Sequence, residues 1–194
     1  MFIKSARFIT SAPTLRETPP PLQYPEIVVV GRSNVGKSSF ICKLTRTKIA
    51  KVSSTPGKTR LINYFLIDQR WYLVDLPGYG FAKVSKIIKE RWAQAMEEYL
   101  AKRQGIRLAI LLVDCRHPVK ESDLQMYAWL QENSLPTQVV LTKIDKIGKN
   151  QLQRQLAETA RAFNLAPSDL LALSSQSGQG FESLEGRLKA ALQD

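Results

Sequence analysis

A glycine-rich octapeptide that ends in lysine and serine is the part of the sequence best suited to chemistry. It reads GRSNVGKS over residues 31–38 and fits the pattern GxxxxGK[ST]. Its glycines let the backbone curl so that successive N–H groups point at phosphate oxygens. The lysine can reach the β- and γ-phosphates of a nucleotide, and the final serine hydroxyl is a suitable Mg²⁺ ligand. We expect phosphate binding by Gly31, Arg32, Ser33, Asn34, Val35, Gly36, Lys37 and Ser38; a glycine-rich turn with a coincidental lysine is the alternative.

The motif Asp75-Leu76-Pro77-Gly78 follows an apolar run and adds a carboxylate. Ligands bind at the carboxyl ends of strands in open α/β sheets. At such a position Asp75 can hold Mg²⁺ through a water molecule, and the Gly78 N–H can meet a γ-phosphate. Aspartate and glycine are common at strand ends, so the motif alone is weak. Its spacing after the glycine-rich loop favours nucleotide binding by Asp75, Leu76, Pro77 and Gly78.

A third motif, Thr142-Lys143-Ile144-Asp145, has the chemistry to select a base. A carboxylate at Asp145 accepts hydrogen bonds from the ring N1–H and the exocyclic amino group of guanine. Adenine presents a lone pair at N1 and leaves the carboxylate unpaired, so such a site rejects it strongly. The stem of Lys143 can lie along the base, whereas Thr142 stands where the usual motif has asparagine. Leu173, Ser174 and Ser175 follow a later apolar run and can offer N–H groups to the guanine carbonyl oxygen; a charged loop and a serine turn are the alternatives.

Apolar runs alternate with amphipathic segments from Glu26 onward. The predicted strands are Ile27–Gly31, Leu61–Asp68, Trp71–Leu76, Arg107–Asp114, Thr137–Thr142 and Leu170–Ser174. The predicted helices are Lys37–Arg46, Lys86–Arg103, Ser122–Gln131, Gln151–Phe163 and Gly180–Leu192. Alternation of this kind predicts a three-layer α/β fold with a six-stranded, mainly parallel sheet. The two-residue turn between the second and third strands predicts a hairpin, and so one antiparallel edge strand.

Residues 1–25 differ in composition from the rest of the chain. They end in a proline-rich stretch, residues 19–25, which favours extended backbone. They contain no apolar segment long enough for a secretory signal. We therefore expect an N-terminal extended arm over residues 1–25 and one nucleotide-binding domain over residues 26–194.

Composition limits the classes of protein that fit. The chain has 194 residues and a formal net charge of +11, which favours a polyanionic partner, either nucleic acid or an anionic membrane surface. The longest apolar run, Leu108–Val113, is too short to span a membrane. Cys42 and Cys115 are far apart and show no metal-binding spacing, so we expect two buried thiols in a reducing compartment.

Positive charge is concentrated near the predicted nucleotide site. The basic residues there are Lys43, Arg46, Lys48, Lys51, Lys58, Arg60, Lys83, Lys86, Lys89 and Arg91. This pattern favours an RNA surface, and a solvated helix face is the alternative.

The ordered motifs resemble those of translation-factor-type GTPases and, more narrowly, those of the EngB family of bacterial GTPases, also called YsxC or YihA. The matching blocks are GRSNVGKSSF at 31–40, TPGKTRLINYF at 55–65, VDLPGYGFAKV at 74–84, Arg116-His117-Pro118 and TKID at 142–145. The resemblance implies a single Ras-like P-loop NTPase domain that binds GTP, GDP and Mg²⁺. It also implies a cytoplasmic, monomeric protein that acts in assembly of the large (50S) ribosomal subunit, in contact with rRNA and ribosomal proteins. Loss of such proteins is associated with defects in cell division and septation.

The same resemblance assigns roles to individual residues. It makes Ser38 and Thr59 the Mg²⁺ ligands, and it places a first switch at Gly57, Lys58, Thr59, Arg60 and Leu61. Asp75–Gly78 then begins the second switch. Lys37, Thr59 and Asn34 are the residues expected to support hydrolysis, Asn34 by holding K⁺ beside the phosphates as in related GTPases with a GxxNxGK loop.

One departure bears on the rate of hydrolysis. Tyr79 follows Gly78 where the best-known GTPases have a glutamine that orients the attacking water. A phenol does not replace that amide, so we expect slow intrinsic hydrolysis accelerated by K⁺ or by a ribosomal partner. The main alternative is a ribosome-binding or rRNA-binding module that the nucleotide only stabilises, without significant turnover. A membrane-surface GTPase is a third hypothesis, and neither an amphipathic anchor nor a lipidation signal supports it.

Overall fold

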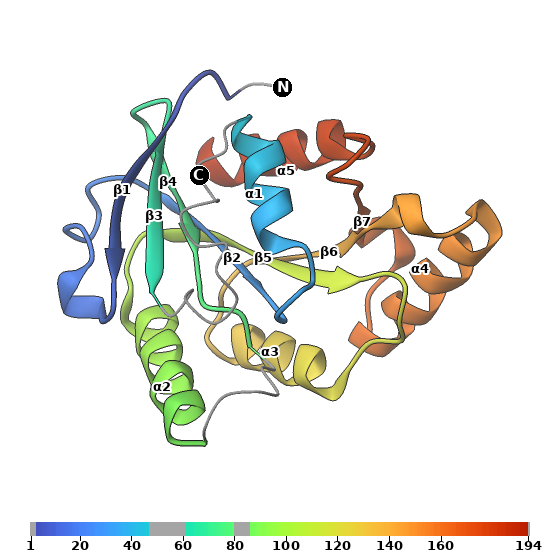
Figure 1. The fold of residues 1–194 in the computed structure, drawn as a ribbon, viewed down its shortest axis with the longest axis horizontal. Coiled ribbons are helices and arrows are strands. Elements are labelled where there is room, and N and C mark those ends of the chain that lie inside the picture. Colours follow the sequence, from blue (N-terminus) through green and yellow to red (C-terminus); the bar gives the residue numbers. More distant parts are fainter. Residues whose placement is uncertain (1–2, 47–60, 80–85, 194) are drawn as a thin grey trace.

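The structure, a computed structural model, describes residues 3–46, 61–79 and 86–193, without the side chains of residues 86–93. Its centre is one seven-stranded sheet in the order β1-β3-β4-β2-β5-β6-β7 (Figure 1). The strands are β1 (Ala6–Ala12), β2 (Glu26–Gly31), β3 (Ile62–Ile67), β4 (Trp71–Asp75), β5 (Ile106–Asp114), β6 (Thr137–Thr142) and β7 (Leu171–Ala172). The helices are α1 (Lys37–Thr45), α2 (Lys86–Lys102), α3 (Glu121–Glu132), α4 (Lys149–Phe163) and α5 (Phe181–Gln193). Short 3₁₀ turns lie at Leu15–Glu17, Ile144–Lys146 and Pro167–Asp169.

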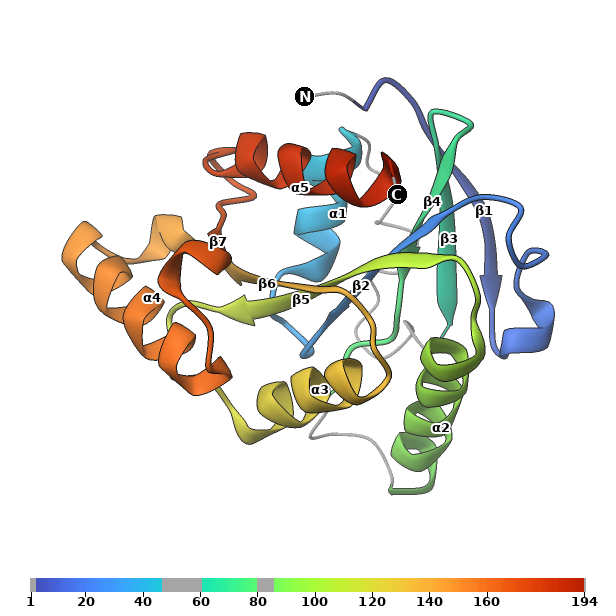
Figure 2. The ribbon, with the colours of Figure 1, turned by 180° about the vertical axis from the view of Figure 1, so that it is seen from behind.

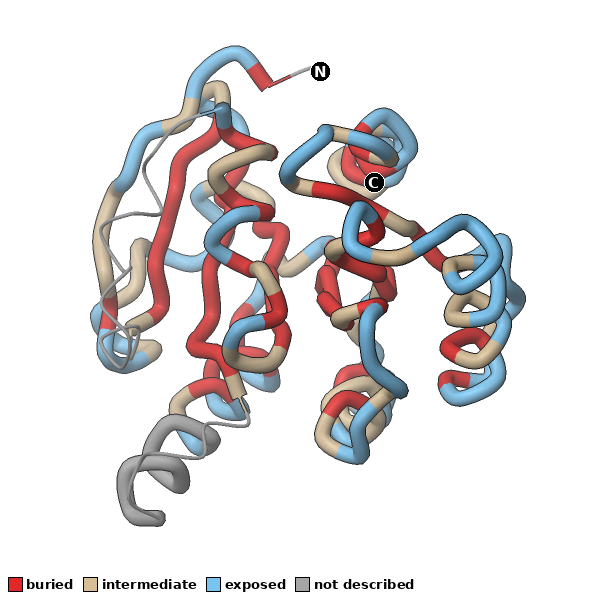
Figure 3. Tube along the Cα trace, turned by 45° about the vertical axis from the view of Figure 1, so that its right-hand side comes forward, coloured by how far each residue is buried: buried red, intermediate tan, exposed pale blue. Residues whose placement is uncertain are grey.

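The helices cover both faces of the sheet and make two separate cores. Along β2, Val28 and Val30 enter the core under α2, α3 and α4, whereas Ile27 and Val29 enter the core under α1 and α5 (Figures 1 and 2). Successive side chains of a strand point to opposite faces, so a continuous apolar run is what a strand covered on both sides requires. Figure 3 shows the result, with buried strands inside and exposed helix surfaces outside. The predicted three-layer α/β fold is confirmed.

The sheet has one more strand than the six predicted. β1 comes from the expected arm and pairs antiparallel with β3, from Ala6 opposite Ile67 to Ala12 opposite Ile62. The predicted hairpin is present as β3 and β4, but β3 is not the edge strand, because β1 covers its free backbone groups. The other neighbouring strands pair in parallel. β1 is mostly exposed or half-buried, so its sequence lacks the apolar pattern that revealed the other strands.

A buried polar network fixes the proline-rich connection between β1 and β2. The guanidinium of Arg103, just after α2, donates to the Glu26 carboxylate at the start of β2, with 2.8 Å between Nε and Oε1. It also donates to the carbonyl oxygens of Pro19, at 2.9 Å, and Pro20. The Tyr99 hydroxyl donates to the second oxygen of Glu26. The Arg103 and Glu26 side chains are almost fully buried, so this ion pair ties the end of α2, the start of β2 and the connection together.

Two smaller sequence predictions have mixed outcomes. Cys115 is buried as expected, and its burial raises its pKa to about 11, whereas Cys42 is only half-buried. In the described part of the chain, no helix is both long and apolar enough to cross a membrane.

Candidate nucleotide-binding site

The glycine-rich loop joins the end of β2 to the start of α1. Gly36, immediately before α1, has φ of 105°, a conformation that side chains rarely adopt, and Asn34 has φ of 64°. A Cβ at Gly31 would lie 2.9 Å from Cγ1 of Val35, so any other residue there would force its neighbours to shift. The strand, the loop and the helix are therefore arranged as phosphate binding by main-chain N–H groups requires.

The first two predicted motifs meet in a buried ion pair. The ammonium of Lys37, at the start of α1, donates to Oδ1 of Asp75, at the end of β4. These side chains are 9% and 1% exposed. The amide of Asn63 on β3 donates to the other oxygen of Asp75, at 3.3 Å. A buried carboxylate held between a lysine and an amide has a fixed position, and here that position is beside the glycine-rich loop.

The backbone after Asp75 is joined to the same loop. Ser33 N–H donates to the Tyr79 carbonyl oxygen at 2.9 Å, and Tyr79 N–H donates to that of Gly31 at 3.3 Å. A Cβ at Gly78 would lie 3.3 Å from the Ser33 nitrogen, so this close approach favours glycine. The loop and the Asp75–Gly78 segment thus form one surface.

The phenol of Tyr79 is bonded to a neighbouring helix. Its hydroxyl donates to Oδ1 of Asp123, in the first turn of α3, at 2.8 Å. Burial and the adjacent Asp123 carboxylate raise the pKa of Tyr79 far above its ordinary value. The phenol therefore stays protonated at neutral pH and has no basic oxygen to activate water.

The predicted base-selecting residues come together at the ends of β6 and β7. The Ser174 hydroxyl donates to Oδ1 of Asp145 at 2.7 Å. This hydrogen bond is the main cause that lowers the pKa of Asp145, aided by Lys146, whose ammonium lies 3.1 Å from Oδ2. Leu173 N–H donates to the Leu141 carbonyl oxygen at 2.7 Å, which holds the serine loop against β6.

Thr142 and Lys143 connect this region to the glycine-rich loop. The Thr142 hydroxyl, buried at the end of β6, lies 2.7 Å from the carbonyl oxygen of Val35. The Lys143 ammonium donates to the carbonyl oxygen of Asn34 at 2.6 Å. Thr142 lacks the amide of the usual motif, yet its hydroxyl still reaches the loop.

Asp114 is a residue of this region that the sequence analysis missed. It ends β5 and accepts hydrogen bonds from Lys143 Nζ at 2.8 Å and from Arg116 Nε at 2.9 Å. Burial alone raises its pKa, but the bonds from Arg116 and Lys143 outweigh burial and leave the pKa below its ordinary value. Asp75 and Asp145 also follow strands, so an acidic residue at a strand end was the available signal.

Most of the predicted site residues lie at one edge of the sheet. The structure places there Gly31 to Ser38, Asp75 to Gly78, Thr142 to Asp145, and Leu173 to Ser175. Leu61 is half-buried before β3. Gly57, Lys58, Thr59 and Arg60 lie outside the described residues.

The hydroxyl and carboxylate groups at this edge of the sheet are suitable ligands for Mg²⁺. The ion prefers hard oxygen ligands and usually keeps several waters beside one or two protein groups and the substrate phosphates. Ser38 presents an exposed hydroxyl in the first turn of α1, and the Asp75 carboxylate faces the adjacent Lys37. Within the described ranges there is no cluster of three or more His, Cys, Asp or Glu side chains that could hold a metal without such phosphates.

The site has a glycine-rich loop before a helix, a lysine paired with an aspartate, and a further carboxylate at the same sheet edge. This is the arrangement of a P-loop GTPase. Comparison with known proteins agrees, because the family model "50S ribosome-binding GTPase" matches residues 26–143. The chain belongs to the EngB family of GTP-binding proteins, as its motifs predicted.

Relatives and solved structures support this assignment. The "Probable GTP-binding protein EngB" of Clostridium kluyveri is 48% identical over 94% of this chain and 93% of its own length. The protein of the same name from Desulfitobacterium hafniense is 42% identical over 98% of this chain and 95% of its own length. A crystal structure of a probable GTP-binding protein EngB matches with a TM-score of 0.74 and 28% identity, over 87% of this chain and 98% of the other. A crystal structure of Era in complex with MgGDPNP and 16S ribosomal RNA matches with a TM-score of 0.67 and 21% identity, over 87% of this chain and 57% of the other. This match shows that the folds are alike.

Proposed function

We propose that this GTPase hydrolyses GTP slowly, as a switch in assembly of the large (50S) ribosomal subunit. The observation that carries the proposal is the joining of the Asp75–Gly78 segment to the phosphate loop, in a chain that matches a ribosome-binding GTPase family. A segment bonded to the loop can change partners when a γ-phosphate arrives, which is how such proteins have two states. The nucleotide-binding domain is residues 26–194, to which the arm of residues 1–25 adds β1. The protein acts as a monomer in the cytoplasm and has an associated role in cell division and septation.

The nucleotide occupies the sheet edge described above. Main-chain N–H groups of the loop and the Lys37 ammonium would bind the phosphates. Ser38, Thr59 and, through water, Asp75 would hold Mg²⁺. When bound, Mg²⁺ neutralises charge on the phosphates. Lys37 then exchanges its contact with Asp75 for phosphate oxygens.

The proposed base recognition is tested by Asp145→Asn. An amide in place of the carboxylate donates to the extra carbonyl of xanthine and no longer accepts both guanine hydrogens. We expect isothermal titration calorimetry with Mg²⁺ to show preference for xanthosine over guanosine nucleotides. Lys37→Ala is the companion variant and should abolish tight binding of either nucleotide. Equal binding of adenosine and guanosine nucleotides by the unaltered protein would contradict the assignment.

The proposed slow hydrolysis depends on a cation beside Asn34. Tyr79 is bonded to Asp123 and does not orient water, so charge stabilisation must come from elsewhere. Asn34 would hold a K⁺ ion that supplies this positive charge. Turnover of GTP should be faster in K⁺ than in Na⁺ buffer, and equal turnover in both, with or without ribosomes, would refute the role of K⁺.

The ribosomal role is tested by sedimentation with purified large subunits. We expect the protein to sediment with them when loaded with a non-hydrolysable GTP analogue and to be released when loaded with GDP. Binding that ignores the nucleotide, together with absent turnover, would instead favour a module that the nucleotide only stabilises.

A further inference from the structure

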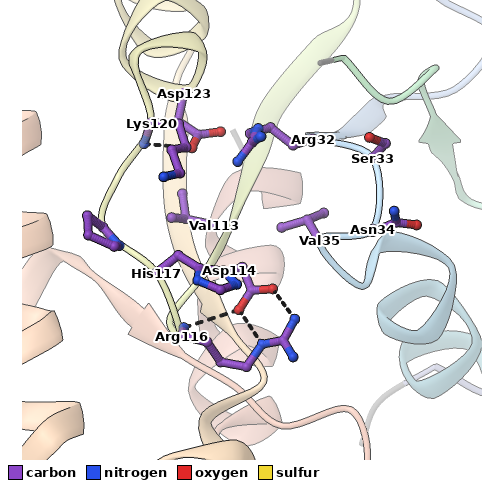
Figure 4. A pocket seen from close by; sticks show the side chains of 11 residues that line it. Arg32, Ser33, Asn34, Val35, Val113, Asp114, Arg116, His117, Lys120 and Asp123 are labelled. Atoms are coloured by element: carbon purple, nitrogen blue, oxygen red, sulfur yellow. Dashed lines mark hydrogen bonds and ion pairs between the residues drawn. The ribbon is translucent and has the colours of Figure 1, made fainter. Parts of the chain in front are cut away.

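A pocket of about 350 Å³ lies beside the phosphate loop, on the side of α3 (Figure 4). Residues 32–35 of the loop form one wall, and the connection from β5 to α3 forms the other. Lys37, Ser38, Asp75 and Asp145 do not line it, but residues 32–35 are shared with the phosphate loop, so the pocket adjoins the proposed nucleotide site.

Cationic side chains outnumber the carboxylates of this pocket. Arg32, Arg116 and Lys120 line it, against Asp114 and Asp123. Both carboxylates are already bonded: Asp114 by Arg116 and Lys143, and Asp123 by the Tyr79 hydroxyl and the Lys120 N–H. Three cations against two carboxylates leave one excess positive charge around the pocket, which favours an anionic ligand.

Arg32 supplies a second, independent observation. Its Nε is buried and, within residues 3–46, 61–79 and 86–193, has no hydrogen-bond partner. Figure 4 shows its side chain reaching into the pocket across from Asp123. A buried donor without an acceptor is unfavourable, so the Arg32 side chain would gain a hydrogen bond by turning toward an anionic oxygen that a ligand brings into the pocket.

The pocket is larger than a small inorganic anion requires, and part of its lining is apolar or flat. Val35 and Val113 are buried apolar lining residues, and the exposed His117 imidazole and Pro118 ring stand with them around the pocket. Unpaired RNA bases are bound by stacking on aromatic or guanidinium planes, with cations on the adjacent phosphate. This combination of flat groups and cations suits a nucleotide better than an acidic side chain of a protein.

We propose that the pocket binds one unpaired nucleotide of RNA, with its phosphate at Arg32 and Lys120 and its base against His117. The proposal rests on the proposed association with the ribosome and adds the point of contact. Arg32 also pairs through its backbone with Tyr79, so RNA bound here touches the segment that joins the two nucleotide motifs.

The test compares Lys120→Gln with Lys102→Gln. Both lysines are exposed and both changes remove one charge, but Lys102 ends α2, at the opposite edge of the sheet from the pocket. The probe is a fluorescein-labelled ten-nucleotide oligouridylate, titrated by fluorescence anisotropy at several KCl concentrations. Lys120→Gln should weaken binding roughly fivefold and reduce the slope of log K against log [KCl] by about 0.7, the value for one phosphate contact on a single strand. Lys102→Gln should leave the slope unchanged, and both variants should bind GDP as the unaltered protein does.

His117→Ala tests the base contact separately. It should weaken oligouridylate binding about threefold without changing the salt slope, because it removes a stacking surface and no charge. Equal effects of the two lysine variants, or no RNA binding by the unaltered protein, would overturn the proposal.

Sedimentation with large ribosomal subunits separates this proposal from the proposed function. If the unaltered protein and Lys120→Gln sediment equally, and both bind RNA equally, the pocket proposal fails and the ribosomal role stands. If the unaltered protein does not sediment, the ribosomal role fails, and the oligouridylate titration still decides about the pocket. Loss of subunit binding in Lys120→Gln with unchanged RNA binding would identify an acidic protein surface and overturn the RNA proposal.

Discussion

The hydroxyl of Ser174 stabilises the ionised form of the carboxylate that we propose selects the base. Ser174 is fully buried, accepts a hydrogen bond from Ser177 N–H at 3.0 Å, and donates to Asp145 at 2.7 Å. A hydrogen bond to the ionised form favours it, so the pKa of Asp145 lies below the ordinary 3.8. Base recognition that needs the carboxylate is therefore present at neutral pH and is lost only as the pH falls through this lowered pKa.

Ser174→Ala should weaken GDP binding and raise the pH below which GDP affinity falls. Loss of one hydrogen bond to a charged group corresponds to about 1.5 kcal/mol, or roughly tenfold in affinity. The Asp145 pKa should rise, so affinity should fall at a higher pH than in the unaltered protein. Calorimetric titrations across acidic pH would measure both effects. Ser177→Ala is the matched control, since its hydroxyl lies in the same loop without contacting Asp145, and identical pH profiles for the two variants would contradict the role of Ser174.

Residue types and spacing predicted the motifs better than the contacts between them. The sequence placed Lys37 at the start of a helix and Asp75 near the end of a strand, and the structure joins them directly. It did not predict that Thr142 would bond the loop, because a hydroxyl has several equally good local partners and only the folded loop after β2 brings the Val35 carbonyl oxygen to it. Asp114 belongs to no motif, and its importance depends on Lys143, which lies 29 positions away in the chain.

The place of the arm in the sheet could not be predicted from its side-chain pattern. Strands covered on both faces have continuous apolar runs, and these predicted β2 to β7 closely. β1 is an edge strand whose pairing is mostly through backbone groups, assisted by Phe8 against Phe65 with ring centroids 5.8 Å apart. Backbone pairing leaves little trace in side-chain pattern, so the extended arm was predictable and its place in the sheet was not.

The network around Arg103 explains how the arm is attached. Arg103 bonds Glu26 and the Pro19 and Pro20 carbonyl oxygens, and it lies just after α2, which itself follows the second predicted switch. Removing one member of a buried ion pair leaves the other charged and unpaired. The network should therefore contribute strongly to the free energy of unfolding.

Arg103→Leu should lower the free energy of unfolding by about 3 kcal/mol, because it leaves the buried Glu26 carboxylate unpaired. Urea unfolding followed by circular dichroism would measure the change. Adding Glu26→Gln removes the unpaired charge and should recover about 1 kcal/mol or more. The exposed Lys102→Gln should change the stability by less than about 0.5 kcal/mol. If Arg103→Leu were no more harmful than Lys102→Gln, the network would not hold the arm.

For the whole molecule, the fold concentrates its specific chemistry at one edge of the sheet. The phosphate loop, Asp75, Asp145 and the serine loop all follow the carboxyl ends of strands, as expected for an open α/β sheet. The opposite edge, where Glu26 and Arg103 meet, is occupied by structural contacts. The net charge of +11 belongs to the molecule as a whole and acts over longer distances than either edge.

That charge leads to a prediction about salt. If large ribosomal subunits are bound through rRNA, neutralised phosphates release counterions, and log K should fall linearly with log [KCl]. Four or more phosphate contacts would give a slope of about −3 or steeper. The measurement is sedimentation or surface plasmon resonance with GTP-analogue-loaded protein at several KCl concentrations. GDP affinity, measured in the same buffers, is the control and should fall far less, because that site contacts the phosphates of one nucleotide only. A flat dependence of subunit binding would mean that ribosomal proteins, rather than rRNA, provide the contact.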